Sequence, residues 1–139
     1  MGQERRKYEA KQRLSFLSNS IAHSSFLVQN PNVQHYESLI DAELADLAGD
    51  SQVANKHYEA AILLAGRRGF TNDEALAHER YGEHALQLGD SDNALYHFER
   101  AIFLYQEWGA NAKVVQLRSA HSSLFLRGDE MTKSTPLTD

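Results

Sequence analysis

The chain has 139 residues, of which 42% are hydrophobic, and this is enough for one domain with a continuous core. Its net charge of −5 gives no electrostatic basis for binding nucleic acid or an anionic membrane, and it favours a basic partner. No cysteine is present, which excludes disulfides, thiolate chemistry and cysteine-based metal sites. We expect a cytoplasmic protein without membrane insertion, because the polar N-terminus resembles neither a signal peptide nor a membrane span.

The apolar periodicity predicts six helices separated by short polar turns. The predicted helices cover about residues 4–27, 33–48, 51–69, 71–88, 91–109 and 110–126. Pro31 is expected to end the first helix, because the residue before a proline is pushed out of the α region. Gly49 fits the left-handed position just past a helix end. The polar composition of residues 129–139 indicates a flexible tail or a linker.

Capping residues support three of the predicted helix starts. Asp50 or Ser51 is expected to cap the third helix, and Asp90 or Ser91 the fifth. Residues 71–74 (TNDE) predict a capping box at the start of the fourth helix, in which a threonine hydroxyl and a glutamate carboxylate each accept a backbone amide.

Two parts of the chain match each other at a fixed offset. Residues 49–51 (GDS) recur as residues 89–91, about 40 positions later, and Tyr58 recurs as the aromatic Phe98. A period of this size is typical of stacked helical hairpins, each of which needs its neighbours to cover its apolar face. Such arrays usually bind other molecules rather than catalyse reactions.

The small and aromatic residues of both hairpins fall at positions that define a known motif. They are Ala42, Gly49, Ala54, Tyr58 and Ala61 in the first hairpin, and Gly82, Gly89, Ala94, Phe98 and Ala101 in the second. This spacing resembles the tetratricopeptide repeat, although His78 stands where that motif favours tryptophan and the period exceeds its usual 34 residues. The resemblance implies an all-α, tetratricopeptide-like α-solenoid of about six antiparallel helices. Residues 1–128 would form the helical-repeat domain, with repeats at about 33–70 and 73–110 and flanking helices at 4–27 and 110–127.

A narrower resemblance covers most of the chain. It rests on residues 30–36, 41–43, 57–62, 69–77 (GFTNDEALA) and 105–114 (YQEWGANAKV). These segments resemble the last helical repeats of large sensor proteins that combine a serine/threonine-kinase-like domain, an AAA-type ATPase domain, GAF or PAS domains and a histidine kinase. The resemblance implies a region that contributes no catalytic residue and that couples a sensor or nucleotide-switch module to an output, or docks a partner.

The ligand-facing positions of the tetratricopeptide motif give a set of candidate partner-binding residues. They are Tyr36, Leu39, Glu43, Asp46, Leu47, Leu76, Glu79, Glu83, Leu86 and Gln87. The set mixes acidic and aliphatic side chains, so a groove on this face would suit a basic amphipathic helix or peptide. The alternative is that these residues pack against the first or last helix of so short an array.

The seven histidines are the main candidates for chemistry, but none lies three or four residues from another. The segment 78–84 (HERYGEH) has a glycine where a zinc-protease motif needs its second histidine. We therefore expect solvated or core-edge histidines. Tyr105 and Trp108 are expected in the core of the last helix pair, and the basic run 5–7 on a solvated helix face with i,i+4 ion pairs.

The sequence thus predicts no catalytic, metal-binding or cofactor-binding residue and no enzymatic activity. The expected function is that of a non-catalytic protein–protein interaction or signal-coupling module that binds a protein or peptide. One alternative is a self-association module that forms a homodimer through exposed terminal helices. Another, from a different class, is a small helical enzyme or metal-binding protein that uses its histidines.

Overall fold

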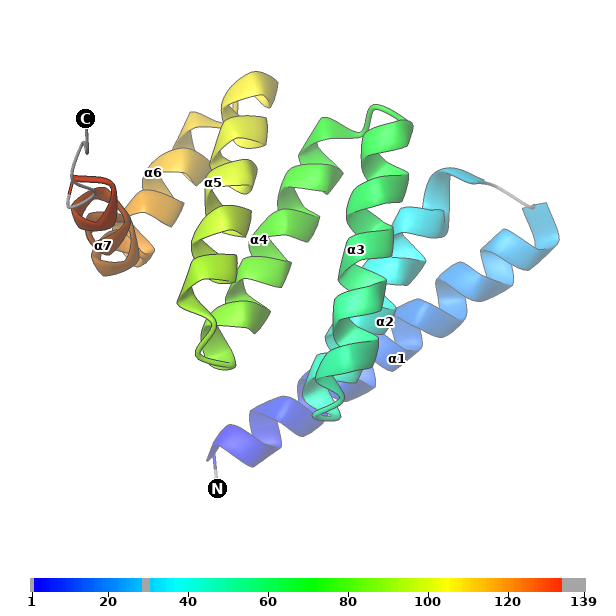
Figure 1. Cartoon of the computed structure of the whole chain (residues 1–139). Helices are drawn as coiled ribbons and strands as arrows, with labels where there is room; N and C mark the ends of the chain where they lie inside the picture. Colours follow the sequence, from blue (N-terminus) through cyan, green and yellow to red (C-terminus); the bar gives the residue numbers. More distant parts are fainter. Residues whose placement is uncertain (1, 29–30, 134–139) are drawn as a thin grey trace.

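The computed structural model describes residues 2–28 and 31–133, which form helices joined by short turns and contain no strand (Figure 1). Their order is α1 (Gly2–Val28), the short 3-10 helix η1 (Pro31–Val33), α2 (Gln34–Leu47), α3 (Ser51–Arg67), α4 (Thr71–Gln87), α5 (Ser91–Trp108), α6 (Asn111–Ala120) and α7 (Ser122–Lys133). The described residues therefore confirm the predicted all-α class.

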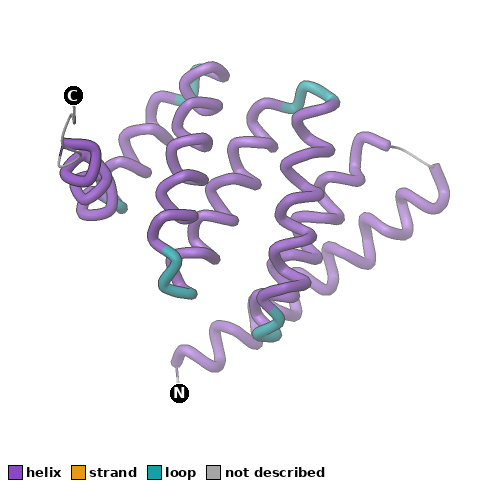
Figure 2. Tube along the Cα trace, viewed as in Figure 1, coloured by secondary structure: helices purple, strands orange, loops and turns teal. Residues whose placement is uncertain are grey.

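The helices follow one another in chain order, and from α1 to α6 each contacts the next, most closely within the pairs α2–α3 and α4–α5 (Figures 1 and 2). Helices α2 to α5 run alternately in opposite directions, joined by turns at their ends (Figure 2). Helix α1 lies along α2 at one end of the row, and α6 and α7 lie beyond α5 at the other (Figure 1). This arrangement, with contacts mostly between neighbours, is compatible with helical repeats.

Four turns share one backbone structure, and each contains a glycine with positive φ. The glycines are Gly49, Gly69, Gly89 and Gly109, with φ of 81°, 74°, 79° and 90°. At the first turn the amide of Gly49 donates to the carbonyl of Asp46, and the amide of Asp50 donates to the carbonyl of Ala45. This pair of bonds is the Schellman motif, which closes a helix end with a left-handed residue. The even spacing of the turns gives α3, α4 and α5 nearly equal lengths of 17, 17 and 18 residues.

The expected caps are confirmed at two helices and wrong at a third. The side chains of Asp50 and Asp90 accept the amides of Val53 and Asn93, each at 3.2 Å. The predicted capping box at residues 71–74 does not form, because the preceding Schellman turn leaves Phe70 at the N-cap position with no side-chain cap bond. The threonine is already inside the first turn of α4.

The small residues of the repeat lie where helices touch. Ala42, Ala54 and Ala94 are fully buried, as are the rings of Tyr58 and Phe98. These two rings belong to two separate core clusters: that of Tyr58 joins α2, α3 and α4, and that of Phe98 joins α4 to α7. The alanines and the two aromatic residues of the motif are therefore core positions, whereas Gly49 and Gly89 lie in exposed turns.

The C-terminal part differs from the predicted single helix over 110–127. It is interrupted at His121, which has φ of −121° and ψ of 29° between α6 and α7. The imidazole of His121 stacks on Phe98 with ring centroids 4.0 Å apart, and its Nε2 lies 2.9 Å from Glu83 Oε1. These two contacts hold the bend against the core, so the described chain has seven α-helices rather than six.

Two further expectations fall in this part of the chain. Helix α7 includes residues 129–133 of the segment expected to be a tail, whereas residues 134–139 lie outside the described part. Tyr105 is 2% exposed and belongs to the core as predicted, but Trp108 is 58% exposed, so its predicted core position was wrong. Trp108 is the last residue of α5, and the neighbouring helices leave its side chain largely exposed.

Candidate functional site

A groove with a volume of about 600 Å³ lies between α1, α2 and α4. It is lined by Lys7, Ala10, Arg13 and Leu14 of α1, by Leu39, Ile40, Glu43, Asp46 and Leu47 of α2, and by Leu76, Arg80 and Gln87 of α4. Most of its apolar lining is aliphatic, and all three walls are helices. The groove therefore combines a leucine-rich surface with a few charged side chains.

The two carboxylates in the groove are each bound to a basic side chain of α4. Arg80 donates to both oxygens of Glu43, from Nε at 2.6 Å and from Nη2 at 3.1 Å. This two-point hydrogen bond raises the pKa of Arg80 further above its usual range. Asp46 Oδ1 lies 2.6 Å from His84 Nδ1, which is 2% exposed. Burial is the largest cause that raises the pKa of Tyr58, and the charges of Glu43 and Asp46 add to it.

Similar contacts continue toward both ends of the row. Glu79 of α4 accepts the hydroxyl of Tyr105 at 2.7 Å and the ammonium of Lys113 at 2.8 Å. Asp73 of α4 accepts the hydroxyl of Tyr36 at 2.7 Å and lies 2.9 Å from His35 Nε2. The hydrogen bond to that carboxylate is the main cause that raises the pKa of Tyr36 to about 12. Side chains of α2, α4 and α6 are thus joined across successive hairpins. We use the term interhelix polar contacts for these pairs together with Glu43–Arg80, Asp46–His84 and Glu83–His121.

The structure brings together six of the ten candidate partner-binding residues in the groove: Leu39, Glu43, Asp46, Leu47, Leu76 and Gln87. The other four lie outside it. Tyr36 and the two glutamates Glu79 and Glu83 take part in the interhelix polar contacts. Leu86 lines a separate cavity beside His121 and packs against the cluster around Phe98.

One wall of the groove comes from α1, none of whose residues was a candidate, although packing of the candidate residues against the first helix was an expected alternative. Lys7, Ala10 and Leu14 recur at helical spacing on one face of α1, and Arg13 extends that face. The spacing is visible in the sequence, but which face of α1 lies toward α2 and α4 depends on how the folded helices pack. Arg80 was not among the candidates, because the tetratricopeptide motif selects its neighbour Glu79. In the folded chain the side chain of Arg80 reaches Glu43 of α2.

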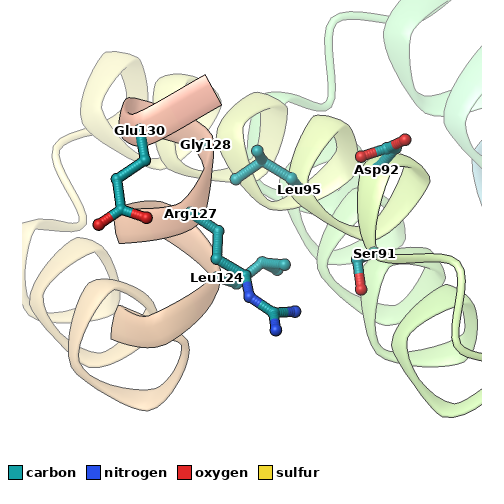
Figure 3. A pocket seen from close by; sticks show the side chains of 7 residues that line it. All are labelled: Ser91, Asp92, Leu95, Leu124, Arg127, Gly128 and Glu130. Atoms are coloured by element: carbon teal, nitrogen blue, oxygen red, sulfur yellow. The ribbon is translucent and has the colours of Figure 1, made fainter. Parts of the chain in front are cut away.

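A second cavity, of about 540 Å³, lies between α5 and α7 (Figure 3). Figure 3 shows Leu95 of α5 directed toward Gly128 of α7, where a Cβ atom would lie 2.7 Å from Leu95 Cδ2. Ser91 and Asp92 line the α5 side of this cavity, and Leu124, Arg127 and Glu130 line the α7 side. None of these residues was a candidate from the sequence.

Among the histidines whose burial the structure describes, four are buried rather than solvated or at the edge of the core: His35, His78, His84 and His97. The rings of His78 and His97 contact each other, with their Nδ1 atoms 2.9 Å apart. Burial lowers the pKa of His78 to about 3, helped by His97 and Arg100, and burial lowers the pKa of His97 to about 4. Both rings are therefore neutral near pH 7, and one Nδ1 donates while the other accepts.

Among the described residues, no three or more His, Asp or Glu side chains form a group that could hold a metal ion. Within the same ranges, no helix is both long enough and apolar enough to cross a membrane. No protein-family model matches this chain, and comparison with curated proteins and with solved structures gave no significant match.

Proposed function

We propose that this chain is a non-catalytic protein-interaction module, built as a tetratricopeptide-like solenoid, that holds a partner in the groove between α1, α2 and α4. The observation that carries this proposal is the groove itself, which has a volume of about 600 Å³ and a largely aliphatic lining. Grooves of this kind between helices receive amphipathic helices through aliphatic anchor residues.

The interhelix polar contacts support the same proposal. They join α2 to α4 through Glu43 and Arg80, and α4 to α6 through Glu79 and Lys113. A groove whose walls are held in place before binding loses less conformational entropy when a partner docks. In a sensor protein of the kind that the sequence resembles, such a module would transmit a change in one domain to the next.

Affinity capture with a groove variant tests this function. Leu14→Glu puts a charge into the groove wall, whereas Leu63→Glu puts the same charge on α3 at a side chain that is 52% exposed outside the groove. A specific partner should be captured by the wild type and by Leu63→Glu and lost with Leu14→Glu, while circular dichroism shows all three proteins folded. A partner retained equally by all three would contradict the groove as its site.

Self-association is the second candidate, because large apolar side chains are exposed on the terminal helices. Tyr8 and Phe16 of α1 are 64% and 71% exposed, and Leu126 of α7 is 63% exposed. Light scattering coupled to size exclusion over a concentration series distinguishes the two functions. A dimer that Phe16→Ser or Leu126→Ser converts to a monomer would support self-association, and a monomer at all concentrations would exclude it.

A further inference from the structure

We propose that the partner segment in the groove is an acidic amphipathic helix, whose aliphatic side chains enter the groove while its carboxylates meet Lys7, Arg13 and Arg80. This inference rests on the proposed function and names the chemistry of the partner. It is the opposite of the basic partner that the sequence analysis expected.

The acidic side chains of the groove are already bound within the chain. The side chains of Glu43 and Asp46 are only 14% and 19% exposed, and each contacts a basic side chain of α4 at 2.6 Å. A basic ligand would have to compete with Arg80 for a carboxylate that accepts two hydrogen bonds from it. Charge-assisted pairs with two bonds are among the stronger polar contacts, so this competition is unfavourable.

The cations of the groove are the accessible charges. The side chains of Lys7 and Arg80 are 56% and 43% exposed. Lys7 has only a long contact of 3.9 Å to Glu4, and Arg13 is exposed on the same wall of α1. Although the whole chain carries a net charge of −5, the charge that this groove presents to a ligand is positive. Complementarity of this local kind decides which partner docks and in which register.

The apolar lining suits a helix rather than an extended strand. Leu39 and Leu47 lie on α2 about 12 Å apart along its axis, a span that side chains two helical turns apart on a ligand helix would match. Leu14 and Leu76 flank this line from α1 and α4. A helix with leucines at i, i+4 and i+7 would fill the groove, and carboxylates on either side of that stripe would reach the cations of α1 and α4.

Binding of three fluorescent peptides of about 16 residues, followed by anisotropy, tests the inference. The first peptide has leucines at the stated spacing with glutamates on both flanks, and the second has lysines in place of the glutamates. The third has the same composition as the first, in an order that places its leucines on different faces of the helix. The acidic helix should bind at least about tenfold more tightly than either of the others, and less tightly as salt is raised.

Two double variants with the same change in net charge locate the effect. Lys7→Glu/Arg13→Glu alters the groove, whereas Lys11→Glu/Lys56→Glu alters exposed positions of α1 and α3 outside it. The first should abolish the preference for the acidic helix, and the second should preserve it. Because the chain has no cysteine, a single introduced cysteine can carry one dye. Gln87→Cys places the dye at the groove, and Lys56→Cys places it away from the groove. Only the fluorescence of the dye at position 87 should change when the acidic helix binds.

Three results would overturn the inference. Tighter binding of the basic helix, if Leu14→Glu removes it, would leave the groove as an interaction site with a partner of the opposite charge. Equal binding of the scrambled peptide would mean attraction without docking. If none of the peptides binds, the acidic helix is wrong as the partner, and the capture experiment with Leu14→Glu and Leu63→Glu decides the proposed function independently.

Discussion

Gly82 shows how one absent side chain sets the distance between two helices. It lies in the middle of α4, and a Cβ atom there would be 2.8 Å from Phe98 Cε1 and 2.9 Å from Phe98 Cδ1. The Phe98 ring is fully buried and stacked on His121, so it has no free space to move into. The glycine is therefore a packing requirement of the contact between α4 and α5, not a helix end.

Replacing Gly82 with alanine should destabilise the protein. Overpacking costs about 1–3 kcal/mol, which exceeds the gain of roughly 0.5–1 kcal/mol that alanine brings inside a helix. Urea unfolding followed by circular dichroism measures the difference. The matched control is Gly66→Ala in α3, where the new Cβ would be 3.3 Å from the carboxylate end of the half-buried Glu74, the flexible end of a long side chain. A Gly82→Ala protein as stable as this control would contradict the packing argument.

The contact between His78 and His97 should make the fold sensitive to acid. Their pKa values are lowered to about 3 and about 4, so the folded state keeps them neutral while the unfolded state binds protons below about pH 6.5. Stability is then complete above that pH and falls as pH decreases from about 6.5 toward 3. The expected loss is about 1 kcal/mol per pH unit for each histidine.

The double variant His78→Phe/His97→Leu removes this effect and isolates it from the other titrating groups. Its free energy of unfolding, measured in urea between about pH 7 and pH 4, should depend less steeply on pH than that of the wild type. Arg100 adds to the low pKa of His78, and the rings of Tyr96 and Tyr81 pack against the pair. Equal slopes for the two proteins would mean that these histidines do not contribute.

At the scale of the helix, spacing in the sequence predicted most of what the structure contains. The apolar period, the aspartate caps and the glycine turns gave α2 to α5 to within a few residues, because all of these signals are local. The break at His121 could not be predicted, since it depends on Phe98 and Glu83, which reach it only in the folded chain. Six of the ten candidate residues were predicted in the right place, but the pairing of their carboxylates was not, because Arg80 and His84 reach Glu43 and Asp46 from a different helix.

The pair of Glu43 and Arg80 should couple α2 to α4 by a modest amount. The two hydrogen bonds favour a measurable interaction, but the arginine side chain is 43% exposed and solvent weakens it. A double-mutant cycle with Glu43→Gln and Arg80→Gln should give a coupling energy of about 1 kcal/mol. A coupling near zero would mean that the helices are held by their apolar contacts alone.

The whole molecule has two core clusters of unequal size among the described residues. The cluster around Phe98 includes side chains of α4, α5, α6 and α7, whereas the cluster around Tyr58 is smaller and joins α2, α3 and α4. In a row of helices that contact mainly their neighbours, local unfolding follows local packing. We therefore expect the end of the row with α1 and α2 to open more readily than its centre.

Amide hydrogen exchange measures this gradient directly. The slowest amides should lie in α5 and the adjacent face of α4, with faster exchange in α2 and the fastest in α1. Phe98→Ala should accelerate exchange across α4 to α7, with a loss of about 3–5 kcal/mol, and Tyr58→Ala should act mainly on α2 and α3. Uniform protection from α2 to α6 would show instead that the chain unfolds as one cooperative unit.

The four equivalent glycine turns make the molecule extensible. The turns at Gly49 and Gly89 end helices with the same pair of backbone bonds, and an aspartate opens the next helix at both. A tandem copy of residues 51–90 would thus enter and leave through junctions that the chain already contains. One in-frame duplication would therefore lengthen the row by a complete hairpin without redesign of either neighbouring helix.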